Sequence, residues 1–328
     1  MPNSCRICGN SENNRIHTAR EMMFGTRDEF DYLECGRCGT VQIVEVPDLS
    51  KYYPKDYYSL ASAGAVAELT SSIQRRFAVR EIGRYFVEGR GAIGRWAAGK
   101  RPWLAGHFPA SLREPLLGLN FRSRILDFGC GAGELLRILH LFGFRALTGA
   151  DAFIDGEIHH PEGITIHKLP LEQLEPAFDL IMLHHSFEHL PEPRKALTEI
   201  RRLLAAGGTC LIRIPVVNLA WAEYGTDWVQ LDPPRHLFLY TERAFRSLAE
   251  ECGFTVAKVT YDSEAFQFWG SEQYRRSIAM NDPQAYSGDI SASIFTAEQI
   301  AEWERKAEEL NAEGRGDQAC FYLKAVSP

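Results

Sequence analysis

The sequence predicts an α/β protein: a doubly wound parallel sheet preceded by a small separate module. Three observations lead to this fold class. Strand-like apolar runs alternate with helix-like stretches from about residue 121 onward, as in parallel sheets. A glycine-rich turn, within residues 124–136, follows the first of these runs. Two CxxC pairs lie near the N-terminus, which indicates a metal-binding module.

The composition is that of a soluble globular protein. The chain has 328 residues, of which 45% are hydrophobic and 24% charged. The formal net charge of −7 argues against broad nucleic-acid binding, which usually needs a basic surface. The sequence shows neither a targeting leader nor an apolar run of membrane-spanning length, so we expect a cytoplasmic protein.

The first module is expected to span residues 1–50 and to be a zinc ribbon. Each CxxC can place two thiolates on one tetrahedral ion, and Gly9 and Gly39 permit the tight turn after each pair. A thioredoxin-like redox motif would occur only once, within a βαβ pattern, so structural zinc is favoured; a labile or lost site stays open. The proposed ligands are Cys5, Cys8, Cys35 and Cys38. The scattered cysteines Cys130, Cys210, Cys252 and Cys320 are interpreted as buried thiols.

Residues 51–120 are expected to form a linker and a basic helical segment. The aromatic stretch 51–60 is either a packed linker or a lid over a cleft. Residues 66–124 hold eleven Lys or Arg and four Asp or Glu, an excess of seven positive charges. Arg75, Arg76, Arg80 and Arg84 alternate with apolar residues as on an amphipathic helix. Three interpretations of such a face are open. It is only a solvated surface, it binds a phosphate-bearing substrate, or it contacts an anionic membrane with the help of Trp96 and Trp103.

The core domain is assigned to residues 121–328. Its glycine turn reads RILDFGCGAGELL, where glycines allow a positive φ and close approach of a ligand. A helix over 134–142 and a strand over 146–150 follow, and the strand ends on Asp151. The later elements are strands over 164–169, 178–183, 209–214 and 255–261, helices over 192–208 and 241–254, a helix over 298–311, and a last strand at the end of the sheet. An excursion over 262–315 is expected to cap the acceptor pocket.

These motifs, in this order, resemble the class I S-adenosylmethionine-dependent methyltransferases. The resemblance covers about Arg124 to Tyr261 and rests on ILDFGCGAG, TGAD, FDLIMLHHSFEHLPEP and LLAAGGTCLIRIP. Together with the CxxC pairs and QLDPPRHLFLYT, the chain is most similar to bacterial sugar methyltransferases with a zinc-binding N-terminal module. The resemblance implies a Rossmann-like sheet of seven strands.

The resemblance also implies where the cofactor lies. A carboxylate just before GCGAG suits the cationic end of S-adenosylmethionine better than the pyrophosphate of NAD. Asp127 would hold the methionine part, and Asp151 would accept both ribose hydroxyls. The turn residues Gly129, Cys130, Gly131 and Gly133 would lie against the cofactor, with further backbone contacts at Leu169 and His184.

Two histidines are the candidate catalytic residues. Methylation of a hydroxyl, or of a carbon beside a carbonyl, needs a base, and histidine suits neutral pH. His189 follows the fourth strand, and His236 lies in the irregular segment after the fifth strand. The alternatives are that His189 orients the next helix and that His236 bonds a loop. Glu188 orients a histidine or the cofactor, or is a surface acid; the side chains of His184 and His185 are expected to be structural.

The predicted function is methylation of a small molecule, most of all a sugar or cell-envelope saccharide. O-methylation is favoured because the sugar C-methyltransferases usually carry a further large C-terminal domain. The alternatives are an RNA base methyltransferase with a zinc ribbon, supported by the basic segment, and a non-catalytic zinc and cofactor-binding adaptor. A nucleic-acid partner is not expected, peripheral membrane contact stays open, and the oligomeric state is not predicted.

Overall fold

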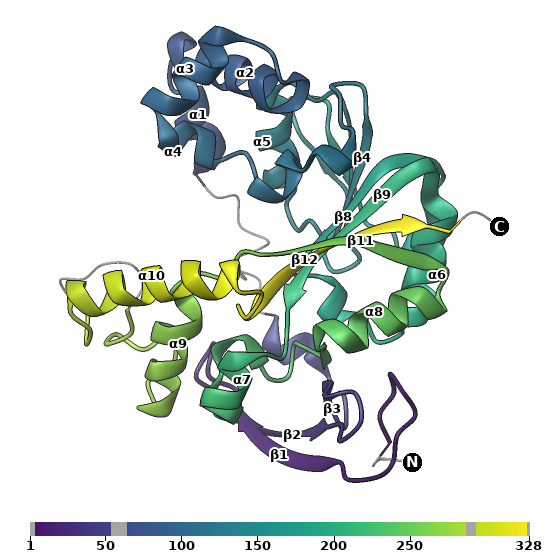
Figure 1. Ribbon diagram of the computed structural model, residues 1–328, viewed down its shortest axis with the longest axis vertical. Helices are drawn as coiled ribbons and strands as arrows, with labels where there is room; N and C mark the ends of the chain where they lie inside the picture. Colours follow the sequence, from purple (N-terminus) through teal and green to yellow (C-terminus); the bar gives the residue numbers. More distant parts are fainter. Residues whose placement is uncertain (1–3, 54–63, 287–292, 327–328) are drawn as a thin grey trace. The chain divides into compact units, whose positions relative to one another are not determined.

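The computed structural model describes residues 4–53, 64–286 and 293–326 (Figure 1). These residues form two compact units. The first unit contains residues 1–54, 187–193 and 213–321, and the second contains 55–186, 194–212 and 322–328. Within the described ranges, no helix is both long and apolar enough to cross a membrane.

The larger sheet confirms the α/β class. Its order is β11-β12-β9-β8-β4-β5-β7-β6. Strand β4 pairs in parallel with β5 and β8, and β5 with β7. The strands are β4 (Arg124–Phe128), β5 (Ala146–Ala150), β6 (Ile158–His159), β7 (Thr165–His167), β8 (Phe178–His184), β9 (Leu204–Pro215), β11 (Phe254–Tyr261) and β12 (Gln318–Ala325).

Two expectations about this sheet are wrong. Among the described residues, the sheet has eight strands instead of seven, because the two-residue strand β6 pairs antiparallel with β7 at the edge of the sheet. So short a strand leaves no hydrophobic periodicity in the sequence. The last strand, β12, lies between β9 and β11 instead of at the end of the sheet.

Strand β4 is buried from Ile125 to Phe128. A parallel strand covered on both faces is expected to be this apolar, and Asp127 is its one acidic residue. Helix α5 (Glu134–Phe142) starts directly after Gly133, as predicted. Helix α6 (Pro193–Leu203) is shorter than expected, since β9 already begins at Leu204, before the glycines that were assigned to the helix end.

The predicted basic helix of the second unit is confirmed as α2 (Ile73–Glu88). Ser72 caps its N-terminus by accepting a hydrogen bond from the Arg75 N–H, and Gly89 ends it with φ 64°. A Cβ at Gly83 would lie 2.0 Å from the Phe142 carbonyl oxygen, so glycine is required where α2 crosses the end of α5. The neighbouring helices are α1 (Ala65–Thr70), α3 (Ala92–Lys100) and α4 (Pro102–Gly106), with 3₁₀ turns at Ala110–Arg113, Pro115–Leu117 and Leu171–Gln173.

The first unit contains a four-stranded sheet of order β1-β2-β3-β10. Its strands are β1 (Arg15–Arg20), β2 (Glu29–Glu34), β3 (Val41–Ile43) and β10 (Phe238–Leu239). The helices of this unit are α7 (Leu219–Tyr224), α8 (Glu242–Glu251), α9 (Phe266–Arg275) and α10 (Ala297–Ala312), with 3₁₀ turns at Leu49–Tyr52, Phe187–His189, Gly225–Asp227 and Val229–Leu231.

The N-terminal strands depend on a late segment of the chain. Strand β10 pairs antiparallel with β3, with Phe238 opposite Gln42 and Leu239 opposite Val41. Thr241 then donates a hydrogen bond to the carbonyl of Cys38 at 2.8 Å. The module therefore folds together with residues 238–241. The predicted domain limits at 50 and 120 stay predictions.

Candidate active site and cysteine cluster

The glycine turn has the tight backbone that its spacing predicts. Gly129, Gly131 and Gly133 have φ values of 76°, 54° and 77°, a region that side chains with a Cβ avoid. A Cβ at Gly129 would lie 2.4 Å from the Cβ of Ser186. The Ser186 hydroxyl in turn donates to the Phe128 carbonyl at 2.8 Å, which ties the end of β8 to the end of β4.

Two buried carboxylates lie at this turn. Asp127 is 3% exposed and Asp151 is 7% exposed. Asp151 accepts hydrogen bonds from the backbone N–H of Gly131 at 2.9 Å and of Phe153 at 2.8 Å. Burial, followed by the charge of Asp151, raises the pKa of Asp127 to about 7. A buried carboxylate with a raised pKa is a site that a cation would stabilise.

The residues present therefore fit S-adenosylmethionine. Asp127 suits its ammonium group, and Asp151 retains lone pairs for the ribose diol. Leu169 lies two residues after β7, and His184 is the last residue of β8; both are half-buried. Cys130 belongs to the turn and is also half-buried. Which of these residues touch the cofactor stays a prediction.

The structure brings His189 and His236 together in the first unit. Their ring centroids are 4.8 Å apart. Nδ1 of His236 lies 2.7 Å from the Gln230 carbonyl oxygen, and Nδ1 of His189 lies 2.8 Å from the Arg235 carbonyl oxygen. Because a carbonyl only accepts, each Nδ1 carries a proton, so the Nε2 atom of each ring is the one that has the lone pair when the imidazole is neutral.

Acidic groups face this histidine pair. Nε2 of His236 lies 3.8 Å from a carboxylate oxygen of Glu188 and 3.8 Å from one of Asp232. Glu188 is fully buried, so the alternative of a surface acid is wrong. Burial, followed by the charge of His236, lowers the pKa of His189. Carboxylates next to a neutral imidazole stabilise the imidazolium that forms when it takes a proton.

A buried arginine holds the loop that carries His236. Arg235 is fully buried and forms salt bridges with Asp232 at 2.5 Å and Glu21 at 3.1 Å. Burial would raise the pKa of Asp232, but Arg235 lowers it overall. Glu21 also accepts hydrogen bonds from the backbone of Phe24 and Thr26. These salt bridges and hydrogen bonds hold the backbone next to His236 in place.

Several parts of this cluster have no signal in the sequence. Asp232, Arg235 and Glu21 meet across more than two hundred residues, and Tyr53 places its hydroxyl 3.2 Å from Nδ1 of His189. Tyr53 belongs to the aromatic stretch 51–60, of which residues 54–60 lie outside the described part, so the lid hypothesis is not tested. Glu188, His189 and His236 also offer donor atoms within 4.8 Å of one another, a set that could hold a divalent cation.

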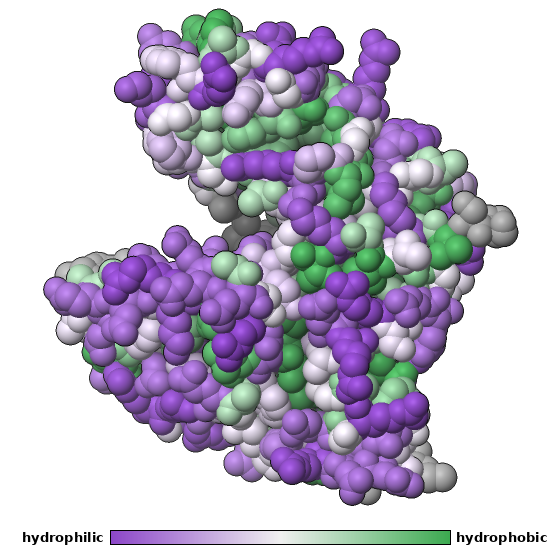
Figure 2. Space-filling model, in the orientation of Figure 1, coloured by the Kyte–Doolittle hydropathy of each residue, from purple (hydrophilic) through white to green (hydrophobic). Residues whose placement is uncertain are grey.

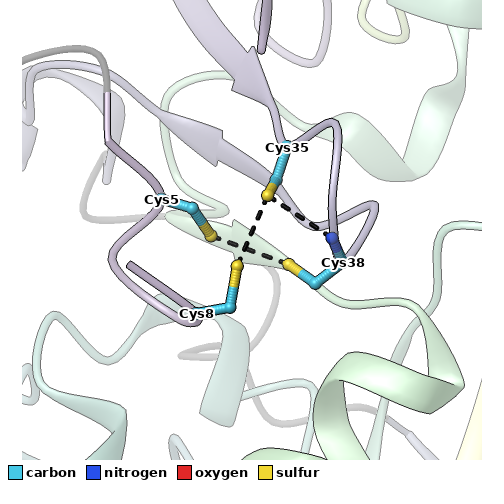
Figure 3. A group of neighbouring side chains, drawn as sticks. All are labelled: Cys5, Cys8, Cys35 and Cys38. Carbon is cyan, nitrogen blue, oxygen red and sulfur yellow. Dashed lines mark hydrogen bonds between the residues drawn. The ribbon is translucent and has the colours of Figure 1, made fainter. Parts of the chain in front are cut away.

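The four cysteines of the CxxC pairs form one cluster (Figure 3). The sulfur of Cys5 lies 3.7 Å from that of Cys38, and the sulfur of Cys8 lies 3.5 Å from that of Cys35. Ligands of a tetrahedral zinc ion, each about 2.3 Å from the metal, are about 3.8 Å apart. The two turns are closed by hydrogen bonds from Gly9 N–H to Cys5 and from Gly39 N–H to Cys35.

The cluster has the contacts expected around thiolates. The backbone N–H of Cys38 points at the Cys35 sulfur at 3.4 Å, and the Asn10 amide lies 3.8 Å from the same atom. The hydrogen bond between Cys5 and Cys38 lowers the pKa of Cys38 and raises that of Cys5. The donor set and its spacing fit zinc.

A family model described as "Methyltransferase domain" matches residues 101–259. The ubiquinone biosynthesis O-methyltransferase of Maricaulis maris (strain MCS10) is 31% identical over 191 residues, which are 51% of this chain and 72% of that protein. The enzyme of the same name from Ruegeria sp. (strain TM1040) is 28% identical over 186 residues, 48% of this chain and 73% of the relative.

Among solved structures, the mycolic acid cyclopropane synthase CmaA1, complexed with SAH and CTAB, aligns over 85% of this chain and 99% of its own. The sequence identity is 16% and the TM-score 0.42, so it supports no inference about this chain. The family model and the relatives define a methyltransferase domain. The chain belongs to the class I S-adenosylmethionine-dependent methyltransferases, and it is an enzyme of that class.

The pKa of Asp127 makes cofactor affinity depend on pH. Below about pH 7 the free protein holds a proton on Asp127, and a cationic ligand must displace it, so the Kd for S-adenosylmethionine should rise by up to about tenfold per pH unit on acidification. Asp127→Asn should weaken S-adenosylmethionine binding at pH 8 by about 10- to 100-fold, because a charge-assisted hydrogen bond is lost. The substitution should also flatten the pH dependence of the Kd. Titration calorimetry between pH 6 and 8.5 measures both.

The stability of the free protein provides the control. The folded pKa of Asp127 lies above the unfolded value of about 3.9. The contribution of Asp127 to the free energy of unfolding is therefore fully present below the unfolded pKa and is lost as the pH rises through about 7. Asp127→Asn should raise the melting temperature of the free protein at pH 8 while it weakens cofactor binding. A variant with unchanged affinity and the wild-type pH slope would remove Asp127 from the cofactor site.

Proposed function

We propose that this enzyme O-methylates a small molecule, with a sugar or cell-envelope saccharide as the leading acceptor class. One observation carries the assignment to hydroxyl chemistry: two imidazoles with lone pairs on Nε2 lie against buried carboxylates. A hydroxyl nucleophile needs such a base, since its proton must leave as the methyl group is transferred. The choice of a saccharide rests on the resemblance of the sequence motifs.

A phenolic hydroxyl is the second candidate acceptor. Two curated relatives that match about half of this chain are named ubiquinone biosynthesis O-methyltransferases. Their names favour O-methylation and are consistent with an aromatic acceptor. A phenol is more acidic than a sugar hydroxyl and therefore depends less on a strong base.

In the proposed mechanism, the cofactor supplies a methyl group on a positively charged sulfur. Asp127 would hold the ammonium group and Asp151 would hold the ribose, and together they would orient the cofactor. Nε2 of His236 takes the proton of the acceptor hydroxyl. Glu188 and Asp232 stabilise the resulting imidazolium, while the Gln230 carbonyl holds Nδ1 and thereby the orientation of the ring. His189, kept neutral by its burial, contacts the acceptor.

The cysteine cluster is proposed to bind structural zinc through Cys5, Cys8, Cys35 and Cys38. Four sulfur ligands leave no coordination position for a substrate. Zinc would hold the two turns that flank β1 and β2, next to the pairing of β3 with β10. A redox role is not proposed.

A product screen tests the function. The enzyme is incubated with S-adenosylmethionine that carries a deuterated methyl group and with separate pools of nucleotide sugars, glycans, phenols and RNA. Mass spectrometry should find a labelled product in the saccharide pool, or in the phenol pool for the second candidate. A Gly129→Val variant, which has no space for its side chain beside Ser186, serves as the control and should give no product. Label in RNA alone would overturn the proposal.

A further inference from the structure

A surface of the second unit combines exposed apolar and basic side chains. Helix α2 presents Ile73, Phe77, Arg80 and Arg84 along one stripe, at the i, i+4, i+7 and i+11 spacing of one helix face. Ile73 is 86% exposed and Phe77 is 56% exposed. The opposite face of the helix is apolar and buried, with Ala78, Val79 and Ile82. Exposure of Ile73 and Phe77 to water does not stabilise a folded monomer.

The same feature continues on α3 and α4. Exposed fractions are 53% for Ile93 and 63% for Trp96 on α3, and 43% for Trp103 on α4. Of the nine exposed large hydrophobic residues in the described ranges, five lie between residues 73 and 103. The part of the molecule that carries α2–α4 shows apolar and charged residues side by side (Figure 2). Exposed apolar side chains that gather on neighbouring helices mark an interaction surface.

These helices are packed together. A Cβ at Gly94 of α3 would lie 2.0 Å from the Glu81 carbonyl oxygen of α2, so the two backbones approach closely. The Arg75 guanidinium of α2 lies 5.0 Å from the ring centre of Trp103 on α4. The exposed side chains therefore belong to one rigid helical layer, here named the α2–α4 surface: Ile73, Phe77, Arg80, Arg84, Ile93, Trp96 and Trp103.

The arginines of this surface border a concave basic site. Arg80 and Arg84 line a cavity of about 310 Å³ together with Arg122, Arg145 and one acid, Glu88. Burial, and after it the charge of Arg80, lowers the pKa of Arg145. The positive charges are thus crowded, and an anion would relieve their repulsion.

We propose that the α2–α4 surface docks on a membrane that contains anionic lipids. Indole and phenyl rings with isoleucines suit the interfacial region of a bilayer, and neighbouring arginines suit lipid phosphates. Charge supports this occupant: residues 66–124 have an excess of seven positive charges in a chain of net charge −7. RNA is disfavoured because aliphatic side chains such as Ile73 and Ile93 offer bases no stacking platform. This inference does not depend on the proposed acceptor.

Co-sedimentation with vesicles tests the inference. The full chain is mixed with vesicles of phosphatidylcholine alone or with one third phosphatidylglycerol. Binding should need the anionic lipid and should fall at high salt. The double variant R80E/R84E and the double variant F77A/W96A should each lower the partition coefficient by about tenfold or more. Arg305→Glu on α10 and Val46→Ser change an exposed charge and an exposed apolar residue elsewhere and should bind as wild type.

Several results would overturn the inference. Wild-type protein that stays in the supernatant with anionic vesicles would do so, as would R80E/R84E binding at the wild-type level. The protein could instead form a dimer in solution and not bind vesicles. If Phe77→Ala and Trp96→Ala made that dimer monomeric, the surface would be assigned to a second copy of the chain. Retention on RNA that these variants abolish, again without vesicle binding, would assign it to nucleic acid. Melting temperatures separate these outcomes from misfolding.

Discussion

Replacing His236 by glutamine is expected to lower kcat by about 10²- to 10⁴-fold on the acceptor that the product screen identifies. The reason is the loss of the nitrogen that takes the proton: Nε2 lies 3.8 Å from both Glu188 and Asp232, and Nδ1 is committed to the Gln230 carbonyl. Glutamine has a size similar to that of histidine but cannot serve as a base. Steady-state kinetics over a range of pH provides the measurement.

Four further measurements separate a base from a positioning residue or a metal ligand. The acid limb of the pH profile of kcat should disappear in His236→Gln, which a purely structural loss would not produce. Affinity for S-adenosylmethionine should stay at the wild-type level, because Asp127 and Asp151 are unchanged. His189→Gln should have the smaller effect on kcat and the larger effect on KM. Added Mg²⁺ should leave the turnover of the zinc-loaded enzyme unchanged if the cluster works as a base; turnover that requires Mg²⁺ would make Glu188, His189 and His236 metal ligands instead.

The local motifs of this chain were readable from its sequence. The glycine turn, with Asp127 before it and Asp151 at the end of the next strand, depends on short-range geometry that glycine spacing and strand pattern specify. The cysteine pairs are local in the same sense, since each CxxC builds its own turn. Both features are found in the structure at the predicted positions.

The parts that were missed depend on contacts between distant segments. No periodicity links Glu21 to Arg235, and nothing in the sequence shows that β10 would complete the sheet of the N-terminal module. The ion pairs of Arg235 decide how His236 is presented, yet arginine in PPRH looks like an ordinary surface residue. A buried charge is recognised only when its partners are seen. The sequence therefore identifies the histidines as candidates but not the network that holds them.

Loss of the cysteine cluster is expected to have the largest effect on stability. The purified protein should contain one zinc ion per chain by elemental analysis, and Cys35→Ser should lose it. Structural zinc contributes about 10 to 16 kcal/mol in zinc-finger peptides. The cluster lies beside the strands that pair with β10, and the Thr241 hydroxyl donates to the Cys38 carbonyl, so its loss should also release residues 236–241. The melting temperature of the first unit should fall sharply.

The effect should differ between the two units. Turnover should be lost with zinc, because the Tyr32 hydroxyl, which donates to the His236 carbonyl at 3.0 Å, comes from the same sheet. Cofactor affinity should be retained, because the glycine turn, Asp127 and Asp151 all belong to the second unit. Cys252→Ser replaces a half-buried cysteine outside the cluster and is the matched control; it should keep both zinc and activity. Protein that binds zinc but melts at the same temperature after chelation would show that the ion does not stabilise the fold.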